Sequence, residues 1–250
     1  MKIAVITGAS SGMGKWFAAY AKAFFPEIEQ IWLIGRNQKR LQRVSDHIHL
    51  NSIILPLDLT DEEDIQAYAD LLEKEKPDIK LLVNSAGMGL IGHFEDMSSI
   101  DSRKIIKINC EALTNITRLS LDYMHENSNI INLASSAAFV PQPGFAVYAA
   151  SKSYVLSFSQ ALSKELKKAK IYVTAVCPGT VDTPFIKTAE KYQNIKGYKK
   201  FFMSDEKRVV ITALWDAKKH RSKSVYGIWM KLLLLAAKLL PVRLLLMFMK

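Results

Sequence analysis

The alternation of short apolar runs with segments of helical periodicity is the feature that most constrains the fold. Strands that alternate with helices form βαβ units, whose crossovers are right-handed by default. The sequence therefore predicts an α/β fold: a single-domain, Rossmann-like, doubly wound parallel sheet of about seven strands with helices on both faces. The runs expected as strands lie at residues 2–7, 30–35, 52–58, 80–87, 129–134, 171–178 and 223–227.

A glycine-rich turn, TGASSGMG, joins the first expected strand to a helical pattern. Amides and the dipole at a helix N-terminus favour anions, so this context is typical of a loop that binds a pyrophosphate. The spacing is GxxxGxG, with Gly8, Gly12 and Gly14, rather than the commoner GxGxxG. A tight turn that needs only positive φ is the alternative explanation.

The residue after the second expected strand bears on the choice of cofactor. In nucleotide-binding sheets an acidic residue at this point holds the ribose hydroxyls of NAD, whereas a nearby arginine accommodates the 2′-phosphate of NADP. Here the acid is absent and Arg36 stands in its neighbourhood, with Lys15 and Arg40 as further cations. This favours NADP(H) over NAD(H), while an arginine at a solvated helix start is the alternative.

Ser135, Tyr148 and Lys152 follow one another at offsets of thirteen and four residues. Tyr148 and Lys152 share one face of a helix expected at about 147–167. A cation one turn from a phenol favours the phenolate, so we expect Lys152 to lower the pKa of Tyr148 from its usual value of about 10. Ser135 can donate a hydrogen bond to the same oxygen atom with which the tyrosine exchanges a proton. Chance helical spacing is the alternative for the Tyr148 and Lys152 pair alone.

Two further groups of polar or small residues stand at informative places. Asn109 lies inside a long helix expected at about 99–125, where it should bend the helix and hold a water near the lysine, because its amide needs partners. Asn84, Ala86 and Gly87 end the fourth expected strand. Ligands of open parallel sheets bind at the carboxyl ends of strands, so these three are expected to face a cofactor.

Taken in order, TGASSGMG, NSAG, Ser135 with YAASK, and PGTVDTP resemble the classical short-chain dehydrogenase/reductase family over about residues 1–185. The resemblance implies a catalytic tetrad in which Tyr148 is the general acid in carbonyl reduction. Ser135 would hold the carbonyl oxygen, Lys152 would also bind the nicotinamide ribose, and Asn109 would anchor a proton-relay water. The implied cofactor site comprises Thr7, Gly8, Ser10, Gly12, Met13, Gly14, Asp58, Leu59, Asn84, Ala86, Gly87, Tyr148, Lys152, Pro178, Gly179, Val181 and Thr183.

The same resemblance implies a homodimer paired through the helices around 100–125 and 147–167, and a substrate flap at about 185–205 within a domain of residues 1–227. The family's usual glycine-rich C-terminal ending is missing, which puts its usual tetramer interface in doubt. An apolar lid or packing on the sheet or on a partner explains the flap's large apolar residues equally well. These are Phe185, Tyr192, Tyr198, Phe201, Phe202 and Met203.

The C-terminal tail, residues 228–250, is apolar except for four cations, and Pro241 should divide it into two short helices. Lysine and arginine outnumber acidic residues by 34 to 24, but eight of them follow Asp216, the last acid. This distribution argues against a nucleic-acid surface spread over the fold. Attachment to an anionic membrane surface, packing on the cleft or a partner subunit, and a membrane span all stay open.

The predicted function is an NADP(H)-dependent oxidoreductase that reduces a ketone or aldehyde, or oxidises the matching secondary alcohol, with a lipophilic substrate. Cys110 and Cys177 lack metal spacing and suggest no disulfide framework, so we expect no metal and a cytoplasmic protein, peripheral on the inner face of the membrane if the tail binds there. The alternative is a non-catalytic nucleotide-sensing or membrane-interaction protein on the same fold.

Overall fold

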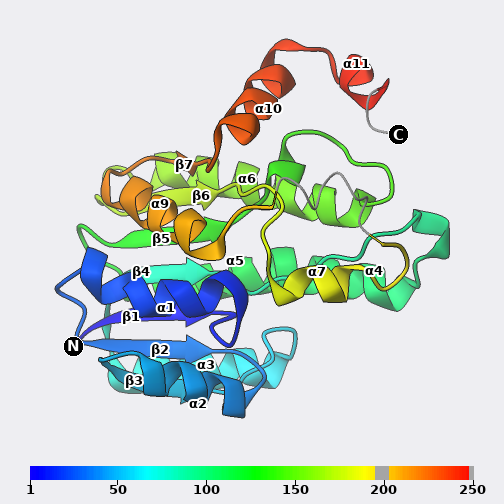
Figure 1. The fold of residues 1–250 in the computed structure, drawn as a ribbon. Coiled ribbons are helices and arrows are strands. Elements are labelled where there is room, and N and C mark those ends of the chain that lie inside the picture. Colours follow the sequence, from blue (N-terminus) through cyan, green and yellow to red (C-terminus); the bar gives the residue numbers. More distant parts are fainter. Residues whose placement is uncertain (195–202, 248–250) are drawn as a thin grey trace.

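The computed structural model describes residues 1–194 and 203–247 of the chain. Within these ranges seven parallel strands form one sheet in the order β3-β2-β1-β4-β5-β6-β7 (Figure 1). The predicted fold class is therefore confirmed. The strands are β1 Lys2–Thr7, β2 Gln30–Ile34, β3 Asn51–Leu55, β4 Asp78–Asn84, β5 Asn129–Leu133, β6 Tyr172–Val176 and β7 Lys223–Ser224.

Helices cover both faces of this sheet (Figure 1). The main ones are α1 Gly12–Phe24, α2 Gln38–His47, α3 Glu62–Glu75, α4 Ser99–Ile106, α5 Leu113–Leu121, α6 Ala146–Glu165, α7 Pro184–Ala189, α9 Glu206–Lys218, α10 Ile228–Leu239 and α11 Val242–Met247. A π-helical segment, Lys107–Ala112, joins α4 to α5, and short 3-10 turns lie at Phe94–Asp96 (η1) and Ser136–Ala138 (η3).

The core consists of two main layers, one on each side of the sheet. Ala4 and Ile6 of β1 pack on the face covered by α1, α2 and α9, whereas Ile3 and Val5 pack on the face covered by α3, α5 and α6. Strands buried on both faces read as continuous apolar runs, which is why the strands could be recognised from the sequence. The chain order reverses between β1 and β4, and ligands of such sheets bind outside the strand ends at this point.

In the turn after β1, the backbone at Gly8 and the backbone at Gly14 approach each other closely. Gly8 has φ of 64°, and a Cβ built on Gly14 would lie 2.2 Å from the carbonyl oxygen of Gly8. The Thr7 hydroxyl accepts hydrogen bonds from the amides of Ser85 and Ala86 at 3.0 and 3.1 Å. These contacts join the ends of β1 and β4, so the glycine turn and the NSAG segment form one rigid edge.

Six of the seven expected strands are shorter than predicted, and the third, fourth and seventh are the informative ones. The third ends at Leu55 rather than at residue 58, because Pro56 has no N–H for the ladder. The fourth ends at Asn84, where the chain leaves the sheet to meet the glycine turn. The seventh is an edge strand of only two residues, Lys223–Ser224.

The helices also differ from the prediction in two places. The long helix expected at 99–125 ends at Leu121 and is interrupted by the π-helical segment, which contains Asn109. The π-helical segment lies where a bend was expected at Asn109, and such segments are a known site of irregularity in α-helices. Helices α7 and α9 were not predicted, because α7 lies at the start of the segment assigned to the flap and α9 follows its lysine-rich part. The two tail helices, α10 and α11, are separated at Pro241 as expected.

Gly14→Ala tests the close approach that fixes the glycine turn. The new methyl group would overlap the Gly8 carbonyl, and neither backbone segment can move without disturbing the ends of β1 and α1. We expect the free energy of unfolding, measured by urea denaturation, to fall by roughly 2–4 kcal/mol. Gly35→Ala is the matched control, because its Cβ would meet its nearest neighbour at 3.5 Å and should change stability little. Equal stability of the two variants would contradict this description of the turn.

Candidate active site

The serine, tyrosine and lysine singled out in the sequence come together at the carboxyl end of β5. Ser135 follows that strand, and Tyr148 and Lys152 lie on the first turns of α6. All three are buried, with 8%, 8% and 5% of their surface exposed. Gly87, at the end of the NSAG segment, is adjacent, since a Cβ built on it would lie 3.4 Å from Lys152 Nζ.

Tyr148 is enclosed by aromatic rings and by backbone. Its ring stacks on Phe145 at a centroid distance of 4.2 Å and contacts Phe185 at 5.6 Å. A Cβ on Gly89 would lie 2.5 Å from the tyrosine ring, so only glycine fits there. Burial raises the pKa of Tyr148 to about 12, and a hydrogen bond with Ser135 opposes this shift only in part. The phenol therefore holds its proton throughout the neutral range.

Lys152 corrects the expectation that a nearby cation would depress the pKa of Tyr148. Its Nζ lies 5.7 Å from the centre of the tyrosine ring and donates a hydrogen bond to the carbonyl of Leu133 at 2.6 Å. Burial lowers the pKa of the lysine itself to about 8. Both groups are removed from water, and desolvation is the largest cause of each shift, so the pKa of the phenol rises instead of falling.

Asn109 is fixed by a hydrogen-bond network in the π-helical segment. Its Oδ1 accepts from the Met88 amide at 2.9 Å, and its Nδ2 donates to the Met88 carbonyl at 2.8 Å and to Ser151 Oγ at 2.9 Å. Ser151 in turn donates to the Tyr148 carbonyl at 2.7 Å. The network joins the asparagine to the helix that carries the tyrosine, so it positions two residues of the expected tetrad.

Sequence reasoning missed Phe145, Ser151, Met88 and Gly89 as parts of this site. Phe145 and Ser151 flank Tyr148 at three residues on either side, the helical spacing that brings side chains together, so the pattern could have revealed them. No comparable signal marks Met88 or Gly89, because their contacts depend on how the segment after β4 passes over α6.

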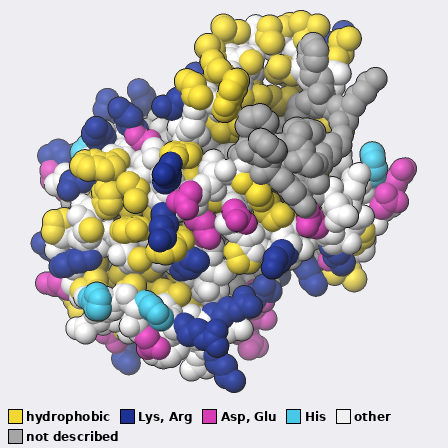
Figure 2. All heavy atoms as spheres, viewed as in Figure 1, with side chains coloured by type: hydrophobic (Ala, Val, Ile, Leu, Met, Phe, Trp, Pro, Cys, Tyr) yellow, Lys and Arg dark blue, Asp and Glu magenta, His cyan; other side chains and the backbone are white. Residues whose placement is uncertain are grey.

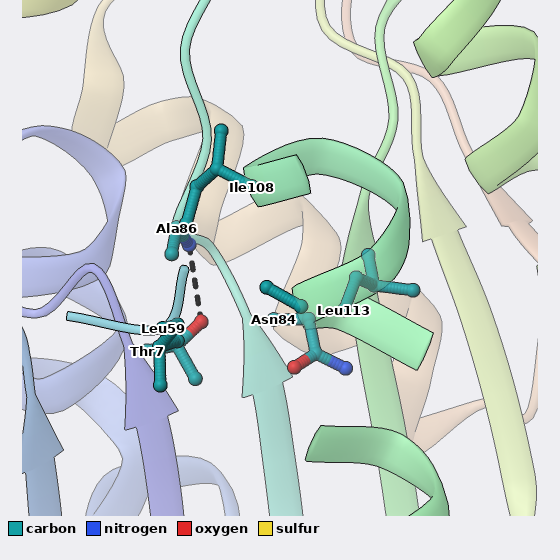
Figure 3. A pocket seen from close by; sticks show the side chains of 7 residues that line it. Thr7, Leu59, Asn84, Ala86, Ile108 and Leu113 are labelled. Atoms are coloured by element: carbon teal, nitrogen blue, oxygen red, sulfur yellow. Dashed lines mark hydrogen bonds between the residues drawn. The ribbon is translucent and has the colours of Figure 1, made fainter. Parts of the chain in front are cut away.

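The cofactor residues predicted around the glycine turn also lie near one another. A Cβ on Gly8 would meet the Ala86 amide at 2.8 Å, and a Cβ on Gly12 would meet Thr183 at 3.8 Å. The ends of β1 and β4, the π-helical segment and the start of α5 border a narrow hollow (Figure 3). Its lining residues are Thr7, Leu59, Asn84, Ala86, Ile108, Ala112 and Leu113.

Asn84 differs from the expectation that its side chain would face a cofactor. It is 2% exposed, and its Nδ2 donates to Thr117 Oγ1 and to Asn132 Oδ1, both at 2.9 Å. Asn132 Nδ2 in turn donates a hydrogen bond to Ser159 Oγ at 2.9 Å. The amide of Asn84 therefore links β4 to β5 and α5 inside the sheet edge, and its Oδ1 is buried without a hydrogen-bond partner among the described residues.

On the adenine side of the expected site, Arg36 lies beside Asp58, with 3.9 Å between the guanidinium and the carboxylate. Asp58 is oriented by hydrogen bonds from the amide and hydroxyl of Thr60. Ser10 lies next to Gly35, the residue before Arg36, whereas Met13 is part of α1 and packs on the core. Arg36 is largely exposed, so its charge is available to a ligand.

The segment after β6 lies over the same edge. The carbonyl of Pro178 accepts a hydrogen bond from the Ser136 amide at 2.8 Å, and Val181 forms a bridge with Ser204. Gly179 is packed against Met230 of α10, since a Cβ there would lie 2.8 Å from the methionine sulfur. The residues expected to flank a nicotinamide thus stand between the serine turn and the tail.

The beginning of the expected flap is fastened to α4. The buried carboxylate of Asp101 accepts hydrogen bonds from Lys191 Nζ at 2.5 Å and from the Tyr192 hydroxyl at 2.6 Å. These contacts lower the pKa of Asp101 to about 2. Tyr192 is therefore tied to α4, and Phe185 packs on Tyr148. The expectations for Tyr198, Phe201 and Phe202 fall outside the described residues.

The order of the sheet and its buried tyrosine and lysine define a dinucleotide-dependent oxidoreductase. Residues 2–194 match the short chain dehydrogenase family. An uncharacterized oxidoreductase from Staphylococcus epidermidis is 34% identical over 185 residues, which are 73% of this chain and 79% of that protein. The chain belongs to the short-chain dehydrogenase family, and it is an enzyme of the dehydrogenase/reductase type.

Solved structures agree with this assignment. A short-chain dehydrogenase from Sphingobium yanoikuyae in complex with NADPH superposes with a TM-score of 0.79 and 27% identity, covering 99% of this chain and 95% of that one. A short chain dehydrogenase/reductase from Burkholderia phymatum in complex with NAD has the same fold, with a TM-score of 0.80 and 23% identity over 95% of this chain and 92% of that one.

The residues at the sheet edge fit the dinucleotide that the family binds. Helix α1 has no acidic residue in its first turn, and Ser11 makes no side-chain capping bond, so neither a carboxylate nor a capping side chain competes with a phosphate at this helix N-terminus. The Lys152 ammonium has three donor hydrogens, of which one is used by Leu133. The other two can serve hydroxyl groups of a ribose. The N–H groups of α1 and of Lys152 are thus donors that suit the phosphates and the ribose hydroxyls of the dinucleotide.

The burial of the Lys152 amine predicts that the free energy of unfolding depends on pH in a particular direction. The folded state binds its proton less tightly than the unfolded chain, because the pKa falls to about 8 from 10.5. The charged amine therefore opposes folding below pH 8, and this cost disappears as the pH rises from 8 towards 10.5. We expect Lys152→Met to stabilise the cofactor-free protein by about 1–3 kcal/mol at neutral pH, and by less at roughly pH 10.

Urea denaturation at the two pH values measures this difference. Lys164→Met, on the exposed side of the same helix, is the matched control and should give no such pH-dependent gain. A Lys152→Met protein that is less stable than the wild type at neutral pH, or whose gain does not change with pH, would contradict the burial argument.

Proposed function

We propose that this enzyme is an NADP(H)-dependent reductase of lipophilic ketones or aldehydes. The observation that carries the proposal is the buried tyrosine, which keeps its proton at neutral pH beside Ser135 and Lys152. A carbonyl group that accepts a hydride needs a proton on its oxygen, and a phenol in this state can donate one. In the reverse reaction, alcohol oxidation, the same residue would act as the base in its phenolate form.

Each residue of the tetrad has a proposed task. A bound nicotinamide cofactor would supply the hydride. Ser135 would orient the substrate oxygen with its hydroxyl, and Tyr148 would transfer the phenol proton to that oxygen. Lys152 would hold the ribose and, once charged, stabilise the phenolate that remains. Asn109 would anchor the water that returns a proton to this pair.

The preference for NADP(H) is proposed from the end of β2. The position lacks the carboxylate that binds ribose hydroxyls in NAD-dependent enzymes, and Arg36 offers an exposed guanidinium suited to a phosphate. Asp58 lies 3.9 Å away and partly balances this charge. Because complexes of similar proteins contain either NADPH or NAD, the proposal rests on Arg36.

A lipophilic substrate is proposed from the surroundings of the tyrosine. Phe145 and Phe185 pack on its ring together with Ala137 and Ala149, and this cluster carries no charge. An apolar wall beside the proton donor favours substrates with carbon-rich groups next to the carbonyl, since burial of apolar surface drives binding. Steroid, fatty acyl and bulky aromatic carbonyl compounds have this character.

We further propose a cytoplasmic homodimer that pairs through α4, α5 and α6. Ile106 on α4 and Tyr154 on α6 are 43% and 42% exposed, and exposed apolar side chains on neighbouring helices are typical of an interface. The two free thiols, Cys110 and Cys177, agree with a reducing compartment.

Tyr148→Phe tests the assignment of the proton donor. We expect NADPH-dependent reduction of steroid, acyl and aromatic ketones to fall by at least roughly 100-fold, while NADPH binding, followed by fluorescence, is retained. Tyr154→Phe is the matched control, because Tyr154 lies on the same helix but is 42% exposed, and its hydroxyl bonds to Thr114 of α5. Wild-type protein that binds NADPH but reduces no carbonyl compound of the panel would favour the non-catalytic alternative.

Arg36→Asp tests the choice of cofactor. The change removes the phosphate-binding cation and places a second carboxylate beside Asp58, so the Kd for NADPH should rise by roughly 10–100-fold while NADH use improves. Titration of both cofactors into the variant measures this. Arg43→Asp, an exposed change of equal charge on α2, is the control. An unchanged ratio of the two affinities in Arg36→Asp refutes the role of Arg36.

A further inference from the structure

The tail holds an unusual share of the apolar surface of this enzyme. Fifteen large hydrophobic side chains are exposed in the described part of the chain, and nine of them belong to α10, α11 and the turn between them. Figure 2 shows hydrophobic side chains gathered over this projecting region. The nine residues are Ile228, Trp229, Leu232, Leu235, Leu239, Leu240, Val242, Leu244 and Met247.

Helix α10 has two apolar faces with different surroundings. Met230 lies against Gly179, at the base of the tail, and the helix packs on η3, the turn that follows Ser135. The outer face carries an apolar stripe at helical spacing, 47–72% exposed, which consists of Ile228, Leu232, Leu235 and Leu239. The inner face is thus explained by packing on the enzyme, whereas the stripe has no apolar partner within the described residues.

Basic residues accompany the stripe, and acidic ones do not. Lys231 and Lys238 lie seven residues apart, so they flank the stripe on one side of α10, and Arg243 follows on α11. No aspartate or glutamate occurs after Asp216. Long cationic side chains beside an apolar stripe can reach lipid headgroups while the stripe enters the acyl region.

The charge distribution distinguishes between two candidate binding partners of the stripe, a second copy of the tail and a membrane. A second copy of the tail would bring the same cations together with no carboxylate of its own to balance them. An anionic bilayer supplies the opposite charge and an apolar layer in one surface. The twelve residues of α10 extend about 18 Å, less than the roughly 30 Å of a bilayer's hydrocarbon core. Among the described residues no helix is long and apolar enough to cross a membrane.

We propose that α10 and α11 form a docking surface for an anionic lipid membrane, in which the Ile228, Leu232, Leu235 and Leu239 stripe lies in the plane of the interface. Because α10 starts beside η3 and Gly179, docking would bring the rim of the catalytic site next to the lipid (Figure 1). The enzyme would then lie on the membrane without spanning it.

Cosedimentation of the full-length protein with vesicles tests this proposal without cofactor or substrate, so its outcome does not depend on the reaction. The vesicles are phosphatidylcholine alone or phosphatidylcholine with phosphatidylglycerol. We expect binding to the anionic vesicles that weakens with added salt, because exposed charges are screened. Leu232→Ser with Leu239→Ser should weaken it at least about tenfold by removing apolar burial, and Lys231→Gln with Lys238→Gln by a similar factor.

Lys167→Gln with Lys168→Gln, the same loss of charge at the far end of α6, is the matched control and should leave binding unchanged. Light scattering shows whether any variant alters the oligomeric state. Wild-type protein that stays unbound on anionic vesicles at low salt would overturn the proposal. So would an equal loss of binding in the control, or a stripe variant that loses only its dimer.

Discussion

The amine of Lys152 lies beneath the carboxyl end of the sheet, where it is 5% exposed and donates to the Leu133 carbonyl. Removing an ammonium from water opposes folding unless hydrogen bonds and nearby dipoles compensate. The remaining fold provides the rigid setting that keeps the amine in place: a sheet with two buried faces and a glycine turn joined to the segment after β4. The same burial determines the state of the neighbouring phenol, so the chemistry of the site depends on this one constraint.

The protonation states follow from this burial. With the pKa of Tyr148 near 12 and that of Lys152 near 8, the cofactor-free site holds a neutral phenol beside an amine that is mostly charged at neutral pH. A neutral phenol is ready to give a proton, and a positive lysine can stabilise the phenolate that forms. Phe145 and Phe185 pack on the ring of Tyr148, and such an apolar surrounding strengthens electrostatic interactions nearby.

Much of this architecture could be predicted from the sequence, for identifiable reasons. The strands are continuous apolar runs, and Tyr148 and Lys152 are related by one helical turn, so both are local patterns. The direction of the tyrosine pKa shift was predicted wrongly, because spacing reveals the neighbouring charge but not the depth of burial. The inward-turned amide of Asn84 and the contacts of Met88 and Gly89 depend on chain crossings between distant segments. Helix α9 was missed because a lysine-rich segment precedes it.

The central claim is that burial, rather than the nearby lysine, sets the state of the tyrosine. NMR of protein labelled at the tyrosine Cζ atoms tests it most directly, with the Tyr148 signal identified by its absence from Tyr148→Phe. In the cofactor-free protein we expect a phenol that stays protonated until about pH 12. A Tyr148 signal that titrates below the ordinary value of about 10 would contradict the account, because the lysine would then outweigh desolvation.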